Sequence, residues 1–152
     1  MRTRELVRQL KLDPNVEWRR GWKVLIKQTD KKGRVVYLSC AAPQPLEYEV
    51  GKMRCRFLDD GPLAGWRYKR DAVMFKEAME DRYGFANKKI HVLFPMLYIQ
   101  ANSYIEQGMV RIAVWQGIDA AGRPIRGREI SKMPKGTVYA ATIVVYGEEV
   151  EI

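Results

Sequence analysis

Two cysteines and one histidine are all the thiol and imidazole groups that this chain of 152 residues contains. Cys40 and Cys55 form neither a metal-binding spacing nor a redox pair, and a zinc site cannot be built from them and one histidine without carboxylates. His91 lies in an apolar run, where a core or sheet residue is the commoner role. The sequence therefore predicts no cofactor, no metal, and buried free thiols rather than a disulfide.

The motifs of the common nucleotide-binding and metalloprotease sites are also missing. No GxGxxG, GxxxxGK[ST] or HExxH occurs anywhere in the chain. We therefore predict a protein that is not an enzyme. A small enzyme with a dispersed site, in which the fold gathers His91, one of the cysteines and carboxylates, is the third hypothesis.

Long hydrophobic runs are absent as well. The longest apolar stretch covers residues 90–99 and contains His91 and Pro95, so it is too short to span a membrane. The first residues, MRTRELVRQLKL, lack the apolar core of a signal peptide. The sequence predicts no membrane partner and a cytoplasmic location, which is the host cytoplasm if the protein is phage-encoded, or the virion if it is structural.

Positive charge is what the chain has in excess. The net charge is +9 and the isoelectric point is near 9.7. Residues 1–34 carry eleven Lys and Arg against four Asp and Glu, whereas residues 148–152 hold three glutamates and no base. Such a balance favours nucleic acid or an acidic protein surface as partner, although a solvated basic surface is the alternative.

Residue patterning predicts one α+β domain over residues 1–152, with a mainly antiparallel sheet built from hairpins. Residues 1–17 should form a basic helical extension that Thr3 caps, serving either as a docking helix or as a phosphate-contacting arm. Residues 18–28 and 35–38 read as a hairpin around a turn at 29–33, where Gly33 can take positive φ. Residues 109–130 could form a second hairpin.

A further hairpin is predicted where residues 45–57 read PLEYEVGKMRCRF. Apolar residues occupy even positions up to Val50 and odd positions from Met53, so a straight strand would expose half of them. A two-residue turn at Gly51-Lys52 removes the conflict and places Glu49 opposite Arg54 and Glu47 opposite Arg56. A bulge at Gly51 is the alternative.

The later part of the chain predicts one amphipathic helix and two apolar strands. Residues 71–83 carry apolar side chains at helical spacing, and Gly84 follows where a left-handed cap belongs. Residues 90–99 form an apolar run, and residues 137–146 are rich in β-branched side chains, which favour strands.

Aromatic and basic residues alternate at 18–23 and again at 66–70. Exposed aromatic rings on a basic sheet could stack bases while cations bind phosphates, but Trp18, Trp22 and Trp66 could equally be core residues with the bases around them. A third basic segment at 123–128 reads as an exposed loop. The predicted contact residues are Arg19, Arg20, Lys23, Arg67, Lys69, Arg70, Arg123, Arg126 and Arg128.

Four short motifs resemble a group of small uncharacterised phage and bacterial proteins. These are LEYEVGK at 46–52, GPLAGW at 61–66, DAVMFKEAMED at 71–81 and MPKGTVYA at 133–140. The chain differs at Gly65-Trp66, where Val-Phe is expected, and in its basic N-terminal extension. The resemblance implies a viral or mobile-element context but no activity.

These observations favour a basic protein that acts by binding nucleic acid, a nucleoprotein or a host factor. A virion or other structural subunit that forms homo-oligomers is the second hypothesis.

Overall fold

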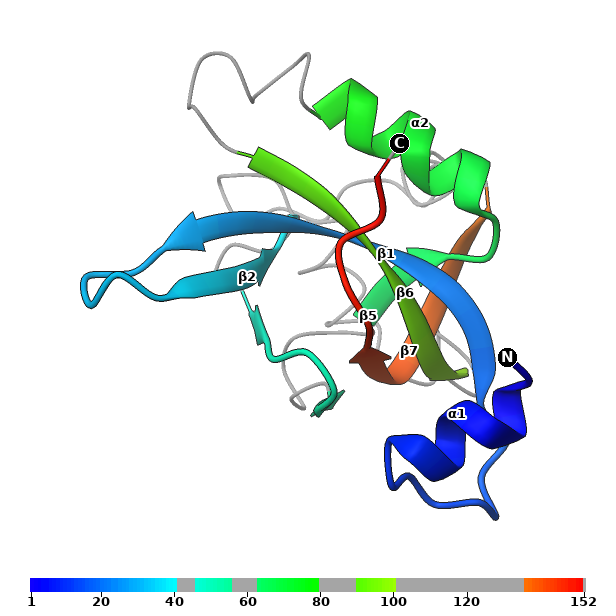
Figure 1. Ribbon diagram of the computed structural model, residues 1–152. Helices are drawn as coiled ribbons and strands as arrows, with labels where there is room; N and C mark the ends of the chain where they lie inside the picture. The colour runs from blue at the N-terminus through cyan, green and yellow to red at the C-terminus, as the bar shows by residue number, and fades with distance from the viewer. Residues whose placement is uncertain (41–45, 56–62, 80–89, 101–135, 152) are drawn as a thin grey trace, which may run out of the picture.

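The computed structural model describes residues 1–40, 46–55, 63–79, 90–100 and 136–151, and in this part of the chain strands hold more residues than helices. Figure 1 shows a curved sheet with a helix against each of two sides. The elements are α1 (Thr3–Gln9), β1 (Arg19–Thr29), β2 (Val35–Ser39), β3 (Glu47–Tyr48), β4 (Met53–Cys55), β5 (Leu63–Trp66), α2 (Lys69–Met79), β6 (Ile90–Gln100) and β7 (Thr137–Val145).

Four of the strands close into a small barrel. β1 pairs with β6 and also with β5, and β7 pairs with the same two strands, so the ring runs β1–β5–β7–β6 and returns to β1. All of these pairings are antiparallel. The α+β class with a mainly antiparallel sheet is therefore confirmed, but the sheet is barrel-like rather than built from hairpins.

The remaining strands extend the sheet at its two ends. β2 pairs with β1 and carries β3 on its other edge, while β4 pairs with β7. β1 is longer than either β5 or β2. One edge of β1 therefore pairs with β5 at Trp22 and with β2 from Leu25 onward. This sharing lets a four-stranded ring carry additional strands without opening.

The predicted hairpin of β1 and β2 is confirmed. Thr29 pairs with Val35, and the turn between them places Gly33 at φ 79°. Asp30 organises this turn, because one oxygen of its carboxylate accepts hydrogen bonds from the backbone N–H groups of Lys32 and Arg34. A local side-chain acceptor of this kind is what favours Asp in turns.

The hairpin predicted for residues 45–57 is wrong. Tyr48 of β3 pairs with Tyr37 of β2, whereas Arg54 of β4 pairs with Ile143 of β7, so Glu49 and Arg54 are not cross-strand neighbours. The residues between form a β-turn in which the N–H of Lys52 donates to the carbonyl of Glu49.

Gly51 takes φ 83° in that turn, which fits the third position of a type II turn rather than the first central position of a type II′ turn. The shift of the apolar residues from even to odd positions therefore does mark a turn. That turn joins two strands, β3 and β4, that pair with different partners. The predicted pair of Glu47 with Arg56 includes a residue, Arg56, that lies outside the described residues.

The barrel interior is filled by alternate residues of its strands. On β6, the side chains of Val92, Phe94, Met96 and Tyr98 belong to the largest core cluster. Between them, Leu93 and Leu97 are also buried, because the helices cover the outer face there. Burial on both faces explains why β6 reads as an unbroken apolar run in the sequence.

Two glycines allow β1 and β5 to approach closely inside the barrel. A Cβ atom at Gly65 would meet the side chain of Met96 and lie 2.9 Å from the carbonyl oxygen of Trp22. A Cβ atom at Gly21 would lie 2.7 Å from the carbonyl oxygen of Trp66. Met96 fills the space that the two absent side chains leave.

The helices pack on the outside of the barrel (Figure 1). Leu6 and Val7 of α1 contact β6 and β7 together with buried Trp18, which supports the docking interpretation of the N-terminal helix. Arg2, rather than Thr3, precedes the helix, and no side chain caps it. The expected cap at Thr3 is therefore wrong.

Helix α2 covers a second outer patch with Ala72, Val73 and Phe75, beside Trp66. It begins at Lys69, two residues before the predicted start, and residues 80–84 of the predicted end lie outside the described part. The possible hairpin at 109–130 also lies outside it. No described helix is long and apolar enough to cross a membrane.

Candidate functional site

The barrel brings basic residues from two distant segments to one end. Arg19 begins β1 and pairs across the sheet with Tyr98, and Arg67 directly follows β5. Burial raises the pKa of the Tyr98 phenol, while the positive charges of Arg19 and Arg67 oppose the rise. Both guanidinium groups therefore lie within electrostatic reach of the same ring, although 47 residues separate them in the sequence.

An exposed aromatic ring stands beside these charges. Tyr68 is 50% exposed, and the guanidinium carbon of Arg67 lies 5.3 Å from the centroid of its ring. The amine of Lys69 lies 5.6 Å from the centroid of Trp22. We refer to Arg19, Arg67, Tyr68, Lys69 and Arg70 as the basic cluster.

Two carboxylates in the described part of the chain lie near the basic cluster. Arg19 pairs with Glu17 at 3.4 Å, but both side chains are exposed and such a pair is weak. Arg70 lies 4.0 Å from the buried carboxylate of Asp71, at the limit of an ion pair. Among the described residues, these two weak contacts are the ion pairs that the basic cluster makes.

Arg20 points to another part of the molecule. Its guanidinium donates to the carbonyl oxygen of Met1 at 2.6 Å and to the hydroxyl of Tyr146 at 3.4 Å. Although exposed, Arg20 holds the N-terminus against the outer face of the barrel. Its neighbour Arg19 faces the opposite side of the same strand, as alternation along a strand requires.

Lys23 is one of the predicted contact residues, but it is buried and so is not placed to contact a partner at the surface. It is 6% exposed, points into the barrel, and donates a hydrogen bond to the carbonyl of Ala64 at 2.5 Å. Its amine lies 5.1 Å from the centroid of the Tyr48 ring. Loss of hydration lowers the pKa of Lys23 from 10.5 to about 8.

The other predicted contacts divide between those that the structure describes and those that it does not. Arg67, Lys69 and Arg70 are exposed. Of these, Arg67 acts on the same Tyr98 ring as Arg19, whereas Lys69 lies over Trp22 and Arg70 lies near Asp71. Arg123, Arg126 and Arg128 lie outside the described residues. Of the three tryptophans considered as base-stacking residues, Trp18 and Trp66 are core residues and Trp22 is half-buried.

The structure also shows where the histidine and the two cysteines of the hypothetical dispersed enzyme site lie. His91 is buried in β6, opposite Ile26 of β1, as expected of a sheet residue. Cys40 lies half-buried with its thiol near the carbonyl of Val24, whereas Cys55 is exposed, which corrects the expectation of two buried thiols. Within the described ranges, no three His, Cys, Asp or Glu residues come together as a metal site would require.

A second polar site lies at the other end of β1, where the C-terminal tail crosses the barrel. One oxygen of Glu149, Oε2, accepts hydrogen bonds from the amine of Lys27 at 2.8 Å and from the hydroxyl of Tyr37 at 3.0 Å. The bond from Lys27 lowers the pKa of Glu149, and the bond to Glu149 raises the pKa of Lys27. Burial, together with the same bond, raises the pKa of Tyr37.

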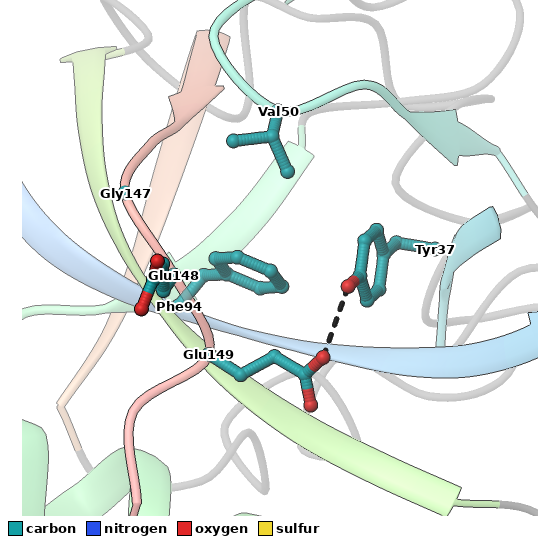
Figure 2. A pocket seen from close by; sticks show the side chains of 6 residues that line it. All are labelled: Tyr37, Val50, Phe94, Gly147, Glu148 and Glu149. Atoms are coloured by element: carbon teal, nitrogen blue, oxygen red, sulfur yellow. Dashed lines mark hydrogen bonds between the residues drawn. The ribbon is translucent and has the colours of Figure 1, made fainter. Parts of the chain in front are cut away.

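This network borders a pocket of about 340 Å³. Figure 2 shows the ring of Tyr37 on one side, the ring of Phe94 at the back, and the tail with Glu149 on the other side. The two rings meet edge to face, with centroids 4.9 Å apart. The lining residues are Tyr37, Val50, Phe94, Gly147, Glu148 and Glu149.

Sequence reasoning missed this pocket. One signal was present, because the three glutamates that end the chain stand out from its basic remainder. Tyr37 and Phe94 had the apolar patterning of ordinary strand residues, and only the barrel places them beside the tail. Comparisons with family models, curated proteins and solved structures found no match.

Proposed function

We propose that the protein binds nucleic acid through the basic cluster and prefers single strands. The observation that supports this is the convergence of Arg19 and Arg67 near Tyr98, with Arg67 also beside the half-exposed ring of Tyr68. The net charge of +9 adds long-range attraction for a polyanion.

The preference for single strands follows from the aromatic ring. Arginine and lysine bind phosphates whether or not bases are paired, but only an unpaired base can lie flat on a side chain such as Tyr68. Stacking of this kind contributes roughly 1–3 kcal/mol per base. The neighbouring guanidinium of Arg67 would hold the adjoining phosphate.

The test is fluorescence anisotropy with a labelled single-stranded oligonucleotide, titrated over a series of salt concentrations. Tyr68→Ala should weaken binding at every salt concentration while leaving the salt dependence unchanged, because it removes stacking and no charge. Arg67→Ala should weaken binding and reduce the slope of log affinity against log salt by about 0.7, the value for one phosphate contact with a single strand.

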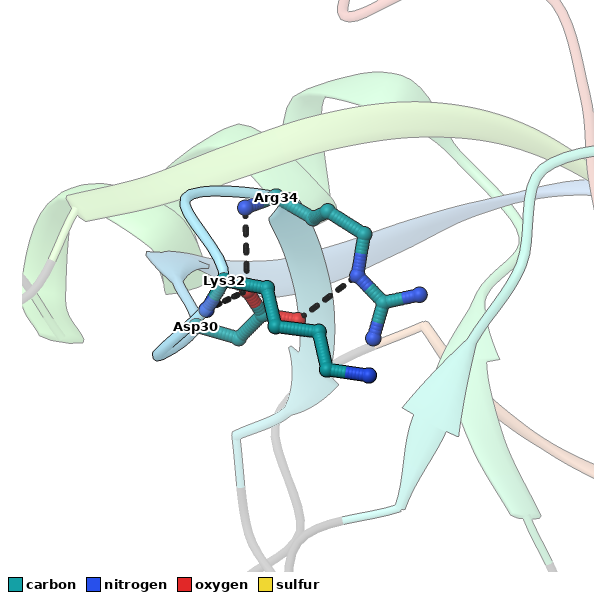
Figure 3. A network of polar contacts seen from close by, with 3 residues as sticks. All are labelled: Asp30, Lys32 and Arg34. Carbon is teal, nitrogen blue, oxygen red and sulfur yellow. Dashed lines mark hydrogen bonds and ion pairs between the residues drawn. The ribbon is translucent and has the colours of Figure 1, made fainter.

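Lys32→Ala is the matched control. Lys32 lies in the turn that joins β1 to β2, at the opposite end of β1 from Arg19, where its backbone N–H bonds to Asp30 (Figure 3). It is exposed and carries the same charge as Arg67. The control should leave affinity within about twofold, because a single distant charge is screened at physiological salt.

Two results would overturn the proposal. One is a lack of binding of the wild-type protein to single-stranded DNA and RNA at low salt. The other is an equal loss of affinity in Arg67→Ala and Lys32→Ala, which would show that net charge rather than the basic cluster determines binding.

A further inference from the structure

Helix α1 is buried on one side and basic on another. Leu6 and Val7 are buried against the outer face of the barrel beside Trp18, so the orientation of the helix is fixed. Arg4 and Arg8 are both exposed. Residues four positions apart lie one above the other on a helix, with about 5–6 Å between their Cβ atoms, so these two arginines leave α1 on the same flank.

Lys11 lies just beyond the end of the helix, seven positions after Arg4 and therefore close to two turns further along this flank. The chain leaves α1 through a Schellman motif. In this motif the N–H of Leu12 donates to the carbonyl of Val7. The N–H of Lys11 donates to the carbonyl of Arg8, and Lys11 itself takes the left-handed conformation, with φ 56°.

A lysine at this position is strained. Glycine is the usual residue there, because other side chains crowd the backbone at positive φ. The side chain of Lys11 is exposed, so burial does not explain its presence. A cation anywhere in the last turn interacts favourably with the helix dipole, so the dipole does not require the left-handed position either. Strain that persists in this way points to a role in binding.

The three cations on this flank are not engaged elsewhere in the described chain. None of the ion pairs between described residues includes Arg4, Arg8 or Lys11. The one carboxylate within α1, Glu5, lies in its first turn, where an acid is favoured by the helix dipole. The flank therefore presents positive charge to solvent.

The beginning of β1 connects α1 to the basic cluster. Arg19 belongs to the cluster, and its neighbour Arg20 donates from its guanidinium to the carbonyl of Met1 at 2.6 Å. This bond holds the residues that precede α1 against the start of β1, and Figure 1 shows the helix beside that end of the strand. Exposed cations thus continue from Arg67 through Arg19 and Arg20 to the helix.

We propose that Arg4, Arg8 and Lys11 bind phosphates, so that a single strand held at the basic cluster continues over the start of β1 onto α1. The inference rests on the proposed function and adds the direction in which the strand leaves the site. Arg4 and Arg8 suit consecutive phosphates, because one helical turn of about 5.4 Å is close to the spacing of phosphates along an extended strand. Such contacts add affinity without reading the bases.

An anionic membrane fits this helix less well. A helix that binds a membrane surface inserts its apolar side among the lipids. In α1 that side, with Leu6 and Val7, is buried on the barrel and is not available. The phosphates of a nucleic acid need only the exposed cations.

The experiment measures fluorescence anisotropy with labelled oligothymidylates of about 4 and about 12 nucleotides, lengths within the range of site sizes for small single-strand-binding domains. Stacking on Tyr68 holds the shorter strand at the basic cluster, whereas the longer strand also reaches α1. Arg8→Ala and Lys11→Gly should each weaken binding of the longer strand at least about threefold and reduce its slope of log affinity against log salt by about 0.7. Binding of the shorter strand should change less than about 1.5-fold, because distant charges are screened.

Lys11→Gly also separates binding from folding. Because glycine takes a φ of 56° without strain, this variant should raise the melting temperature by a few degrees while it weakens binding. Loss of binding in a more stable protein is not explained by unfolding. Lys11→Arg keeps both the charge and the strain and is the matched control, with an affinity within about twofold of the wild type.

Unchanged affinity for the longer strand in Arg8→Ala and Lys11→Gly would overturn the inference and leave the proposed function in place. Equal losses for the two strands would reduce the effect to general charge and would overturn it as well. So would a loss of binding to phosphatidylserine vesicles, rather than to the oligonucleotide, in Lys11→Gly, which would show a membrane surface. If the wild type binds neither strand at low salt, the proposed function fails and the inference fails with it.

Discussion

Replacing Lys23 with methionine tests how strongly the barrel interior disfavours a charge. Lys23 points into the barrel and is 6% exposed, and its one hydrogen bond to a described group goes to the carbonyl of Ala64. Methionine has a similar length and shape but carries neither charge nor donor. The substitution therefore removes the cost of burying the ammonium and leaves the packing largely unchanged.

The size of that cost follows from the lowered pKa. Burial lowers the pKa of Lys23 from 10.5 to about 8, a difference of about 2.5 pH units. At 1.36 kcal/mol per pH unit this corresponds to about 3 kcal/mol of destabilisation when the amine is charged in both states. The variant loses the bond to Ala64, which offsets roughly 1–3 kcal/mol, so at pH 7 its stability should equal or exceed that of the wild type.

The dependence on pH gives the sharper result. Below pH 8 the amine is protonated in both the folded and the unfolded protein, and the full cost is present. Between pH 8 and 10.5 the folded state has released its proton while the unfolded state keeps it, so wild-type stability rises with pH. From pH 7 to pH 10 the wild type should gain about 2.5 kcal/mol relative to Lys23→Met.

Urea unfolding of both proteins at pH 7, 8, 9 and 10 measures this difference. The comparison cancels the titration of other groups, including the tyrosines whose pKa values burial raises. If the two stabilities change in parallel over this range, Lys23 is not desolvated and the interior position of its amine is wrong.

Two further predictions concern the barrel and its tail. Gly65→Ala should lower the free energy of unfolding by about 1–3 kcal/mol in urea, because the new methyl group meets Met96 and the carbonyl of Trp22, and unchanged stability would contradict the close approach. Glu149→Gln should speed hydrogen exchange of the Val150 amide, which bonds to the carbonyl of Leu93. Because the folded pKa of Glu149 lies below its ordinary value of 4.5, the wild type should lose this contribution as pH falls through that lower pKa, and the variant should lack the dependence.

Local elements were largely predictable from the sequence. The β1–β2 turn, the buried strand β6 and the amphipathic helix α2 each depend on signals within a few residues, such as Asp30 with Gly33 or the apolar run at 90–99. Short-range hydrogen bonds and side-chain periodicity determine such elements wherever they occur.

Strand pairing was not predictable in the same way. The shift of apolar residues from even to odd positions around Gly51 correctly predicted a turn. A hairpin in which the two flanking strands pair with each other was only one of the arrangements that such a turn allows. Tyr48 instead pairs with Tyr37 of β2 and is buried in the main core cluster, and Arg54 pairs with Ile143 of β7. Arg54 and Ile143 are far apart in the chain, so no local pattern indicates their pairing.

The basic cluster shows the same division. The alternation of aromatic and basic residues at 18–23 and 66–70 identified Arg19, Arg67 and Lys69, but it gave no reason to separate Lys23 from them. Lys23 lies on the inner face of β1, whereas Arg19 lies at the end of the strand where the interior opens to solvent. How deep a strand residue lies inside a barrel depends on the whole fold, so the neighbouring sequence does not indicate it.

The sequence by itself determined the charge, the class of fold, the positions of most elements and the local turns, since all of these depend on composition or on neighbours in the chain. Only the tertiary structure decided which strands pair, that Lys23 is buried, and that Glu149 of the tail meets Lys27 and Tyr37 of the first hairpin. Those outcomes follow from the tertiary fold, in which closure of the barrel pairs residues up to 79 positions apart, and the free energy of closure is shared by the whole core.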